Sequence, residues 1–171
     1  MSLMNNINAK LKYPTINLSV PGVPTPKQSA RFGMVKNKFG KMIPIVYKDK
    51  EVRIKENNFK ASVIHEISQK YPGFIPYADC GLSIKLTFVF PPLKSMNKKI
   101  IEKISLEKEC VYKITKPDLG DNLKKLTLDA MNGVVYIDDA QICLETARKI
   151  YGNAPRTDIE ISVLPDEMCY L

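Results

Sequence analysis

Four acidic residues stand in two pairs on either side of a short predicted helix. Asp118 and Asp121 precede the helix, and Asp138 and Asp139 follow a short apolar segment after it. Crowded carboxylates repel one another and are costly to desolvate, so such a cluster indicates either a bound cation or a solvated acidic face. The turn residues Leu119-Gly120 between the first two acids favour the cation. We therefore expect the two pairs to meet in space around a hard divalent ion.

Phosphodiester hydrolysis is the chemistry that such an ion would serve. The reaction needs an in-line water and stabilisation of the charge on the attacking and leaving oxygens. Mg²⁺, or Mn²⁺ in its place, supplies both when carboxylates hold it without filling its coordination sphere. We assign Asp118, Asp121 and Asp139 as catalytic metal ligands, and Asp138 as an auxiliary ligand or as an acceptor behind the ligands.

Lys125 is the candidate catalytic cation. The segment from 121 to 131 is predicted to be a helix capped by Asp121 or Asn122, and Lys125 lies one turn past Asp121 on the same face. There it can neutralise the scissile phosphate or the leaving oxygen, with Asp129 holding it in place. A plain i, i+4 ion pair with Asp121, worth a few tenths of a kcal/mol, is the competing interpretation.

The elements that position these residues are read from hydrophobic periodicity. Apolar residues opposite the polar helix face (Leu123, Leu126, Ala130) predict its burial, and Val134–Ile137 is predicted to be a short strand leading to Asp138. Further strands are predicted at 15–20, 42–47, 82–90, 142–146 and 159–163, and further helices at 50–71 and 95–109. This order predicts an α/β or α+β fold in a single domain, with a mixed β-sheet packed against two to three helices. It does not predict the order of the strands in the sheet. We expect a tail at 1–13, the domain at 14–164 and a second tail at 165–171.

The net charge of +8 is unevenly distributed. Residues 1–70 contain thirteen Lys or Arg against four acids, whereas residues 71–171 contain thirteen against fourteen. A basic half beside an acidic cluster suits an enzyme that grips a polyanion, although a solvated basic surface is equally compatible. The predicted DNA contacts follow a proline-rich loop at 21–26 and surround Gly40 in a predicted hairpin or mobile loop: Lys27, Gln28, Arg31, Lys36, Lys38 and Lys41. Phe32 or Phe39 can stack on an unpaired base, but packing within the protein is the favoured prediction.

Several classes are excluded or disfavoured. No apolar run is long enough for a membrane helix, and the N-terminus has no apolar signal core, so we expect a cytoplasmic protein without a membrane partner. The four cysteines are scattered without a C-x-x-C pair, which favours free buried thiols over a zinc site. The single histidine, His65, is predicted to be structural or at the surface.

The acidic motif resembles that of the RusA family of Holliday junction resolvases. The resemblance rests on Lys116-Pro117-Asp118, Asp121-Asn122-Leu123-x-Lys125, Asp129-Ala130-x-Asn132-Gly133 and Asp138-Asp139-x-Gln141-Ile142, and it extends to 20–28, 149–152 and 159–161. It implies a small homodimeric, magnesium-dependent endodeoxyribonuclease, often of phage or prophage origin, that nicks four-way DNA junctions symmetrically in recombination and repair. The family's catalytic acids match Asp118, Asp121 and Asp139, and its essential lysine matches Lys125.

One departure from the family pattern defines the alternatives. The family usually has Asp-x-Asp-Asn, and this chain is one residue longer between Asp118 and Asp121. Asp118 matches if the added residue is absorbed locally, for which Gly120 is best suited. A family member impaired by the longer segment is the main alternative. A calcium loop lacks the required spacing, and a purely DNA-binding protein has no need of clustered acids.

Overall fold

The computed structural model describes residues 13–27, 31–47, 50–106 and 110–165. Its main sheet has four strands in the order β1 (Ile16–Pro21), β6 (Arg156–Val163), β4 (Leu82–Phe90) and β5 (Ile142–Tyr151). β6 runs antiparallel to both of its neighbours, whereas β4 and β5 are parallel. The predicted α+β fold with a mixed sheet is confirmed.

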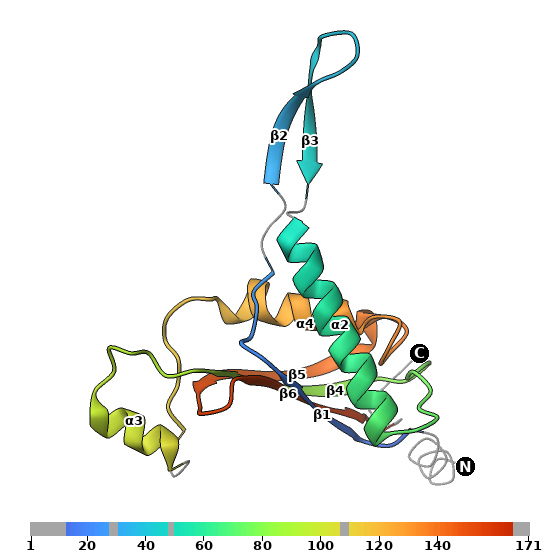
Figure 1. Ribbon diagram of the computed structural model, residues 1–171. Helices are drawn as coiled ribbons and strands as arrows, with labels where there is room; N and C mark the ends of the chain where they lie inside the picture. Colours follow the sequence, from blue (N-terminus) through green and yellow to red (C-terminus); the bar gives the residue numbers. More distant parts are fainter. Residues whose placement is uncertain (1–12, 28–30, 48–49, 107–109, 166–171) are drawn as a thin grey trace.

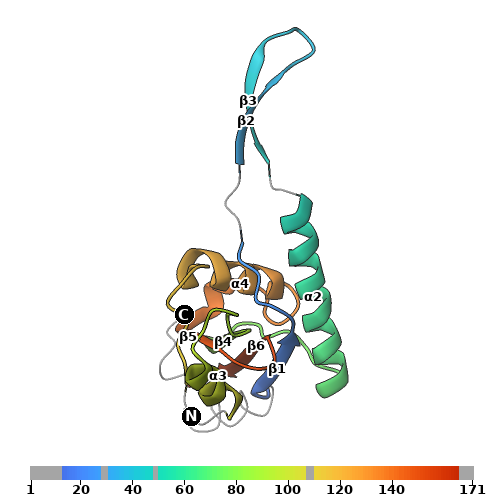
Figure 2. The same cartoon turned by 60° about the vertical axis from the view of Figure 1, so that its left-hand side comes forward.

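Helices cover one face of this sheet (Figure 1). The long helix α2 (Lys50–Lys70) and the short helix α4 (Lys125–Met131) lie on that face, and α3 (Lys98–Ser105) lies at one end. A separate hairpin of β2 (Arg31–Lys36) and β3 (Met42–Tyr47) projects beyond the start of α2 (Figures 1 and 2). No helix in the described part of the chain is long and apolar enough to span a membrane.

The alternation of side chains along the strands explains which face is covered. In β4, Ile84, Leu86 and Phe88 are buried, whereas Lys85 between them is exposed. The buried side chains meet Val63 and Ile67 of α2 in one core. Burial of such side chains contributes about 1.5–3 kcal/mol each, so the pattern stabilises this arrangement strongly. The predicted strand at 82–90 and the predicted helix at 50–71 are confirmed.

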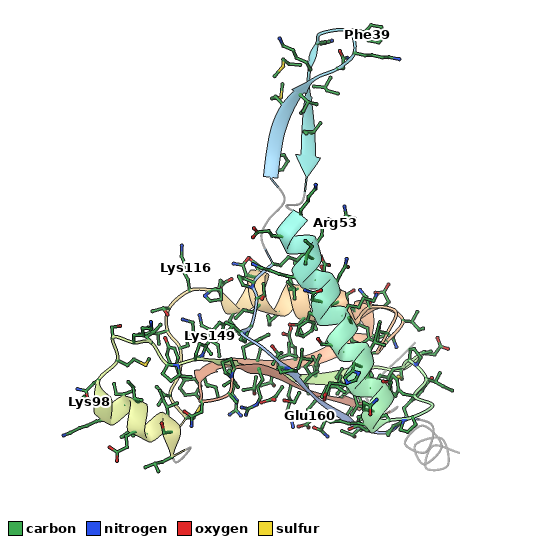
Figure 3. The ribbon with its side chains drawn as sticks, in the orientation of Figure 1. Phe39, Arg53, Lys98, Lys116, Lys149 and Glu160 are labelled. Carbon is green, nitrogen blue, oxygen red and sulfur yellow. The ribbon has the colours of Figure 1, made fainter. Side chains whose placement is uncertain are left out.

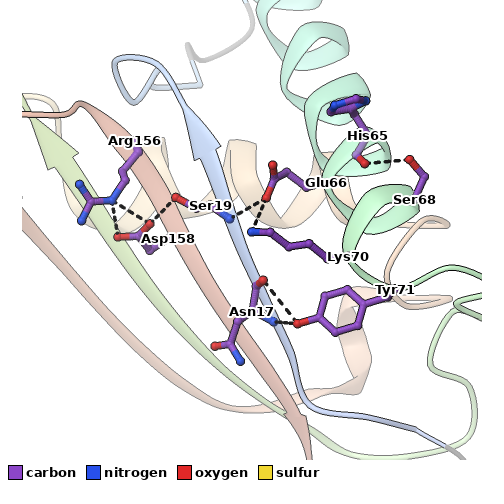
Figure 4. A network of polar contacts seen from close by, with 9 residues as sticks. All are labelled: Asn17, Ser19, His65, Glu66, Ser68, Lys70, Tyr71, Arg156 and Asp158. Atoms are coloured by element: carbon purple, nitrogen blue, oxygen red, sulfur yellow. Dashed lines mark hydrogen bonds and ion pairs between the residues drawn. The ribbon is translucent and has the colours of Figure 1, made fainter.

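Side chains from α2 close the outer edge of β1 (Figure 4). The backbone N–H of Asn17 donates to the Tyr71 hydroxyl at 2.8 Å, and that of Ser19 donates to Glu66 at 3.4 Å. Lys70 pairs with the same carboxylate at 2.7 Å, and its hydrogen bond lowers the pKa of Glu66. This edge is therefore satisfied within the chain and does not offer a free pairing template.

The structure differs from several local predictions. Of the two alternatives predicted around Gly40, the hairpin is the one seen; its first strand, β2 at residues 31–36, was not predicted and pairs with β3. Residues 134–137 form a turn and two isolated bridges at Tyr136 rather than a strand, since the buried Tyr136 hydroxyl donates to the carbonyl oxygen of Leu128 and folds the segment back on α4. Phe32 and Phe39 do not pack inside, being 83% and 82% exposed.

The thiols and the end of the predicted N-terminal tail differ from their predictions as well. Cys110 and Cys143 are exposed and Cys80 is half-buried, so the described cysteines are not the buried core residues that the sequence predicted. Tyr13, assigned by the sequence to the tail, is buried in the core.

Candidate active site

The acidic motif forms a pocket of about 280 Å³ between the helical segment at 119–131 and the start of β5. We call it the acidic pocket, and its lining residues are Gly120, Asp121, Lys124, Lys125, Leu128, Asp129, Asp139 and Glu145. Asp121, Lys125 and Asp139, three of the four residues predicted to be catalytic, thus share one pocket. A larger hollow of about 540 Å³ lies on the polar face of the main sheet and contains none of the predicted site residues.

A widened helical turn places Asp121 at the pocket. The segment η1 (Leu119–Lys124) is a π-helix that continues directly into α4. The backbone N–H of Leu123 donates to the carbonyl oxygen of Asp118 at 3.3 Å, an i to i−5 bond. A π turn holds one residue more than an α turn, so it accommodates the residue that this chain has in excess of the family spacing. The helix consequently starts at Leu119, and the prediction that Asp121 or Asn122 caps it is wrong.

Asp118 is the residue that caps this helix. Its Oδ2 accepts a hydrogen bond from the backbone N–H of Asp121 at 3.1 Å. The carboxylate lies next to the pocket wall, 3.7 Å from where a Cβ on Gly120 would be. Asp118 therefore orients the turn that carries Asp121.

Asp138 likewise caps the turn that carries Asp139. Its Oδ1 accepts from the backbone N–H of Ala140 at 2.8 Å and caps η2 (Asp139–Gln141), while Gln141 accepts from the backbone N–H of Asp138 at 3.1 Å. Gln141 also donates to the carbonyl oxygen of Cys80 at 3.2 Å, which fastens this turn to the residues before β4. Each acidic pair thus contains one capping residue and one residue that lines the pocket.

Ion pairs set the remaining charges around the pocket. Lys124 pairs with Glu145 of β5 at 3.1 Å, across the pocket from α4. Lys27 pairs with Asp129, and its backbone N–H donates to the carbonyl oxygen of Asn122 at 2.9 Å. Asp129 therefore holds Lys27 and the proline-rich loop; the prediction that it holds Lys125 is not the arrangement seen.

Two residues of the site were missed by sequence reasoning. Glu145 lies six residues after Asp139, and its place on a strand that begins at the acidic pair was the available signal. Lys149 of β5 donates from Nζ to the carbonyl oxygens of Thr115 and Pro117, both at 2.7 Å. It thereby fixes the segment that leads to Asp118; Figure 3 labels it together with Lys116 of that segment.

The donor set suits a hard cation. Asp121, Asp139 and Glu145 bring carboxylate oxygens from η1, η2 and β5 to one pocket, and such oxygens are the ligands that Mg²⁺ takes. Among the described residues no three acidic, histidine or cysteine side chains are gathered closely enough to hold an ion as they stand. The elements bring the donors to one place, and the side chains would have to close around the ion.

The predicted DNA contacts fall into two places. Lys36, Lys38 and Lys41 are exposed near the tip of the β2–β3 hairpin, with Lys38 Nζ 5.3 Å from the centre of the Phe39 ring. Figure 3 shows Phe39 at that tip, far from Lys149 of β5 and from the main sheet. Lys27 lies beside the pocket. Gln28 and the side chain of Arg31 lie outside the described residues.

The carboxylates and lysines that line this pocket beside a mixed sheet are the groups that metal-assisted phosphate-ester hydrolysis uses. The chain belongs to the RusA family: the model of the family described as endodeoxyribonuclease RusA matches residues 21–162. The family prediction is confirmed, and it places the chain among endodeoxyribonucleases that act on Holliday junctions. The chain is also similar to the uncharacterized protein YqaN of Bacillus subtilis (strain 168), with 34% identity over 107 residues, covering 63% of this chain and 73% of that protein.

Proposed function

We propose that this protein is a magnesium-dependent endodeoxyribonuclease that resolves four-way DNA junctions by paired symmetric nicks, in recombination and repair. The observation that carries the proposal is the convergence of Asp121, Asp139 and Lys125 on one pocket from separate elements. Family membership supports the class of reaction.

In this proposal Asp121 and Asp139 hold the cation, with Mn²⁺ able to replace Mg²⁺. Asp118 contributes a ligand through the carboxylate oxygen that does not take part in its capping bond. Asp138 supports Asp139 from its own capping position. A cation held by these residues would supply the charge that polarises a phosphate oxygen and activates a water for attack. Lys125, exposed at the same pocket, neutralises the charge that develops on the phosphate or on the leaving oxygen.

DNA is bound in this proposal by the lysines of the hairpin tip and by the basic loop around Lys27. Lys36, Lys38 and Lys41 are mobile donors suited to phosphate contacts, which fix position without reading sequence. Phe39 between them offers an exposed ring that can stack on an unpaired base at the branch point. Paired nicks need two active sites related by a two-fold axis, so the functional unit is a homodimer.

The experiment is incubation of the purified protein with a four-way junction and a matched linear duplex, with Mg²⁺, with Mn²⁺ and with a chelator. We expect paired nicks at symmetric positions in the junction, none in the duplex and none with the chelator. The proposal would be contradicted if neither Mg²⁺ nor Mn²⁺ supported cleavage.

The second candidate function is that of a junction-binding family member impaired in catalysis. It is favoured by the fact that the carboxylates in the described residues are not already gathered around an ion position. Tight, junction-selective binding without nicking in the same experiment would identify it.

A further inference from the structure

The stretch at 91–117 is a basic segment within the acidic half of the chain. It contains seven lysines and three glutamates, whereas the rest of residues 71–171 contains six Lys or Arg against eleven acids. Its helix α3 exposes Lys98, Lys99 and Lys103, while Ile104 is buried against the core. The helix is thus amphipathic, and its lysines face solvent. These lysines belong neither to the hairpin nor to the acidic pocket.

The helix α3 lies at the same end of the sheet as the segment that leads to Asp118. The side-chain amide of Asn153, in the turn between β5 and β6, donates to the carbonyl oxygen of Ser105 at 3.2 Å. The backbone N–H of Tyr151 at the end of β5 donates to the carbonyl oxygen of Val111 at 2.9 Å. Figure 3 shows Lys98 and Lys116 at this end. The exposed side chains here form a surface that we call the α3 flank: Lys98, Lys99, Lys103, Tyr112, Ile114 and Lys116.

A buried lysine anchors the α3 flank to the sheet. Lys113 is 7% exposed, and its Nζ donates to the Thr115 hydroxyl at 2.6 Å. The same Nζ lies 5.1 Å from the centre of the Phe90 ring and 5.3 Å from that of Tyr151, a favourable position for a cation. The backbone N–H of Lys113 donates to the carbonyl oxygen of Lys149 at 3.0 Å. These contacts hold both the backbone and the inward side chain in place.

The anchored segment turns two apolar side chains to solvent. Tyr112 forms a β-bridge with Ile150, and successive side chains of an extended chain point to opposite sides. With Lys113 directed inward, Tyr112 and Ile114 point outward, and they are 62% and 93% exposed. Single exposed apolar side chains are common, but here two are held on one anchored segment among lysines. Cations for the backbone beside apolar or aromatic faces for the bases are the pattern of a nucleic-acid surface.

We propose that the α3 flank binds the DNA strand that runs past the acidic pocket on the Asp118 side, with its lysines on phosphates and with Tyr112 and Ile114 against bases. The proposal rests on the proposed function, which places the scissile phosphate in that pocket. Ile114 precedes Asp118 by four residues and therefore lies within about 14 Å of it. Phosphates follow one another by about 3.4 Å along a strand of duplex DNA, so nucleotides near the scissile phosphate come within reach of the flank. A second copy of the chain is a poorer occupant, because it would bring the same lysines against these.

The phosphate contacts are tested by fluorescence anisotropy with a labelled four-way junction at several salt concentrations, with a chelator present so that binding is measured without cleavage. Joint replacement of Lys98, Lys99 and Lys103 by Gln should lower the slope of log affinity against log salt by about 2–3, because up to three fewer counterions are released. Far-ultraviolet circular dichroism verifies that each variant is folded.

The matched control removes the same number of positive charges from another surface. Lys70, Lys85 and Arg148 line the hollow on the polar face of the main sheet. Their joint replacement by Gln should leave the salt slope unchanged, which separates a contact at α3 from an effect of the net charge.

The base contacts are tested with Tyr112→Ser combined with Ile114→Ser. This double variant should bind the junction about 5-fold or more weakly, because stacking on bases is lost. Its salt slope should equal that of the wild type, since no cation has been removed. Ile75→Ser is the control: it changes an apolar side chain that is 71% exposed outside the α3 flank, and it should not alter the affinity.

An unchanged slope in the α3 triple variant, or an equal fall in the triple variant and its control, overturns the inference. An unchanged affinity of the double variant overturns it as well. Loss of self-association in sedimentation velocity, with junction affinity intact, would assign the flank to a second copy instead. Cleavage by the wild type with Mg²⁺ separates this inference from the proposed function. Cleavage with all slopes and affinities unchanged refutes the flank alone, whereas the expected binding losses in a protein that never cleaves refute the nuclease alone.

Discussion

The carboxylate of Asp118 accepts the backbone N–H of Asp121 at 3.1 Å, so one acid of the motif fixes the turn from which the next acid enters the pocket. This bond gives Asp118 a structural role that is separable from any role as a metal ligand. Asn retains an oxygen that can accept the same N–H, whereas Ala does not.

Substitution of Asp118 should therefore give two distinguishable results. Asp118→Asn keeps the cap and the melting temperature but loses cleavage, because the negative charge is gone. Asp118→Ala loses cleavage and in addition about 1 kcal/mol of the free energy of unfolding. Thermal melting and junction cleavage measure the two effects. Normal cleavage by Asp118→Asn would show that the cation is held without this residue.

Asp139→Asn should lower the cleavage rate at least about 100-fold, equivalent to about 2.7 kcal/mol of transition-state stabilisation. Junction binding should be unchanged or tighter, because a negative charge near the phosphates has been removed. Asp79→Asn is the matched control: Asp79 is exposed outside the pocket, and its φ of 53° is one that Asn tolerates. Single-turnover cleavage and gel-shift titration make the comparison, and equal rates for both variants would remove Asp139 from the site.

Gly120→Ala should preserve activity and stabilise the fold by about 0.5–1 kcal/mol, because Gly120 lies inside a helical turn and does not adopt the left-handed backbone region. Its new Cβ would make an ordinary contact at 3.7 Å with Asp118 Oδ2. Gly133→Ala is the control and should lower the free energy of unfolding, because the φ of 70° at Gly133 favours glycine. Chemical denaturation measures the free energy of unfolding of both variants. Strong destabilisation by Gly120→Ala would contradict the π turn.

Joint replacement of Lys36, Lys38 and Lys41 by Gln should reduce the slope of log affinity against log salt by about 2–3, because up to three fewer counterions are released. Lys27→Gln should change the slope much less, since Lys27 already neutralises Asp129 and holds the proline-rich loop. Fluorescence anisotropy with a labelled junction at several salt concentrations measures both slopes. Equal slopes for the wild type and the triple variant would show that the lysines at the hairpin tip do not contact the DNA backbone.

Lys149→Met should lower the cleavage rate while it leaves junction affinity nearly unchanged. The substitution removes two hydrogen bonds that hold the backbone of Thr115 and Pro117 ahead of Asp118, so the acids lose their alignment while the DNA-binding surface is kept. Lys85→Met is the control, because Lys85 forms an exposed ion pair with Glu160 on the polar face of the sheet, outside the acidic pocket. Separate cleavage and binding assays give the two quantities; an equal loss of both would contradict a positioning role.

The sequence determined the elements whose burial pattern is strong. Leu82–Phe90 is readable because its apolar residues alternate with the period of a strand. Lys50–Tyr71 is readable because apolar residues recur along it with the period of a helix. The sequence also determined the family and the residues of the acidic motif, because the spacing of Asp121, Asn122 and Lys125 along the chain is itself the signal.

Only the tertiary structure decided which acids face the pocket. Asp118 and Asp138 differ from Asp121 and Asp139 through backbone N–H groups that become available when the helical turns form, and composition does not reveal those bonds. Glu145 enters the pocket because β5 contacts η1, and the position of β5 depends on its parallel pairing with β4. The exposure of Phe32 and Phe39 was equally unpredictable: an aromatic residue is buried only where another element covers it, and no described part of this chain covers the hairpin.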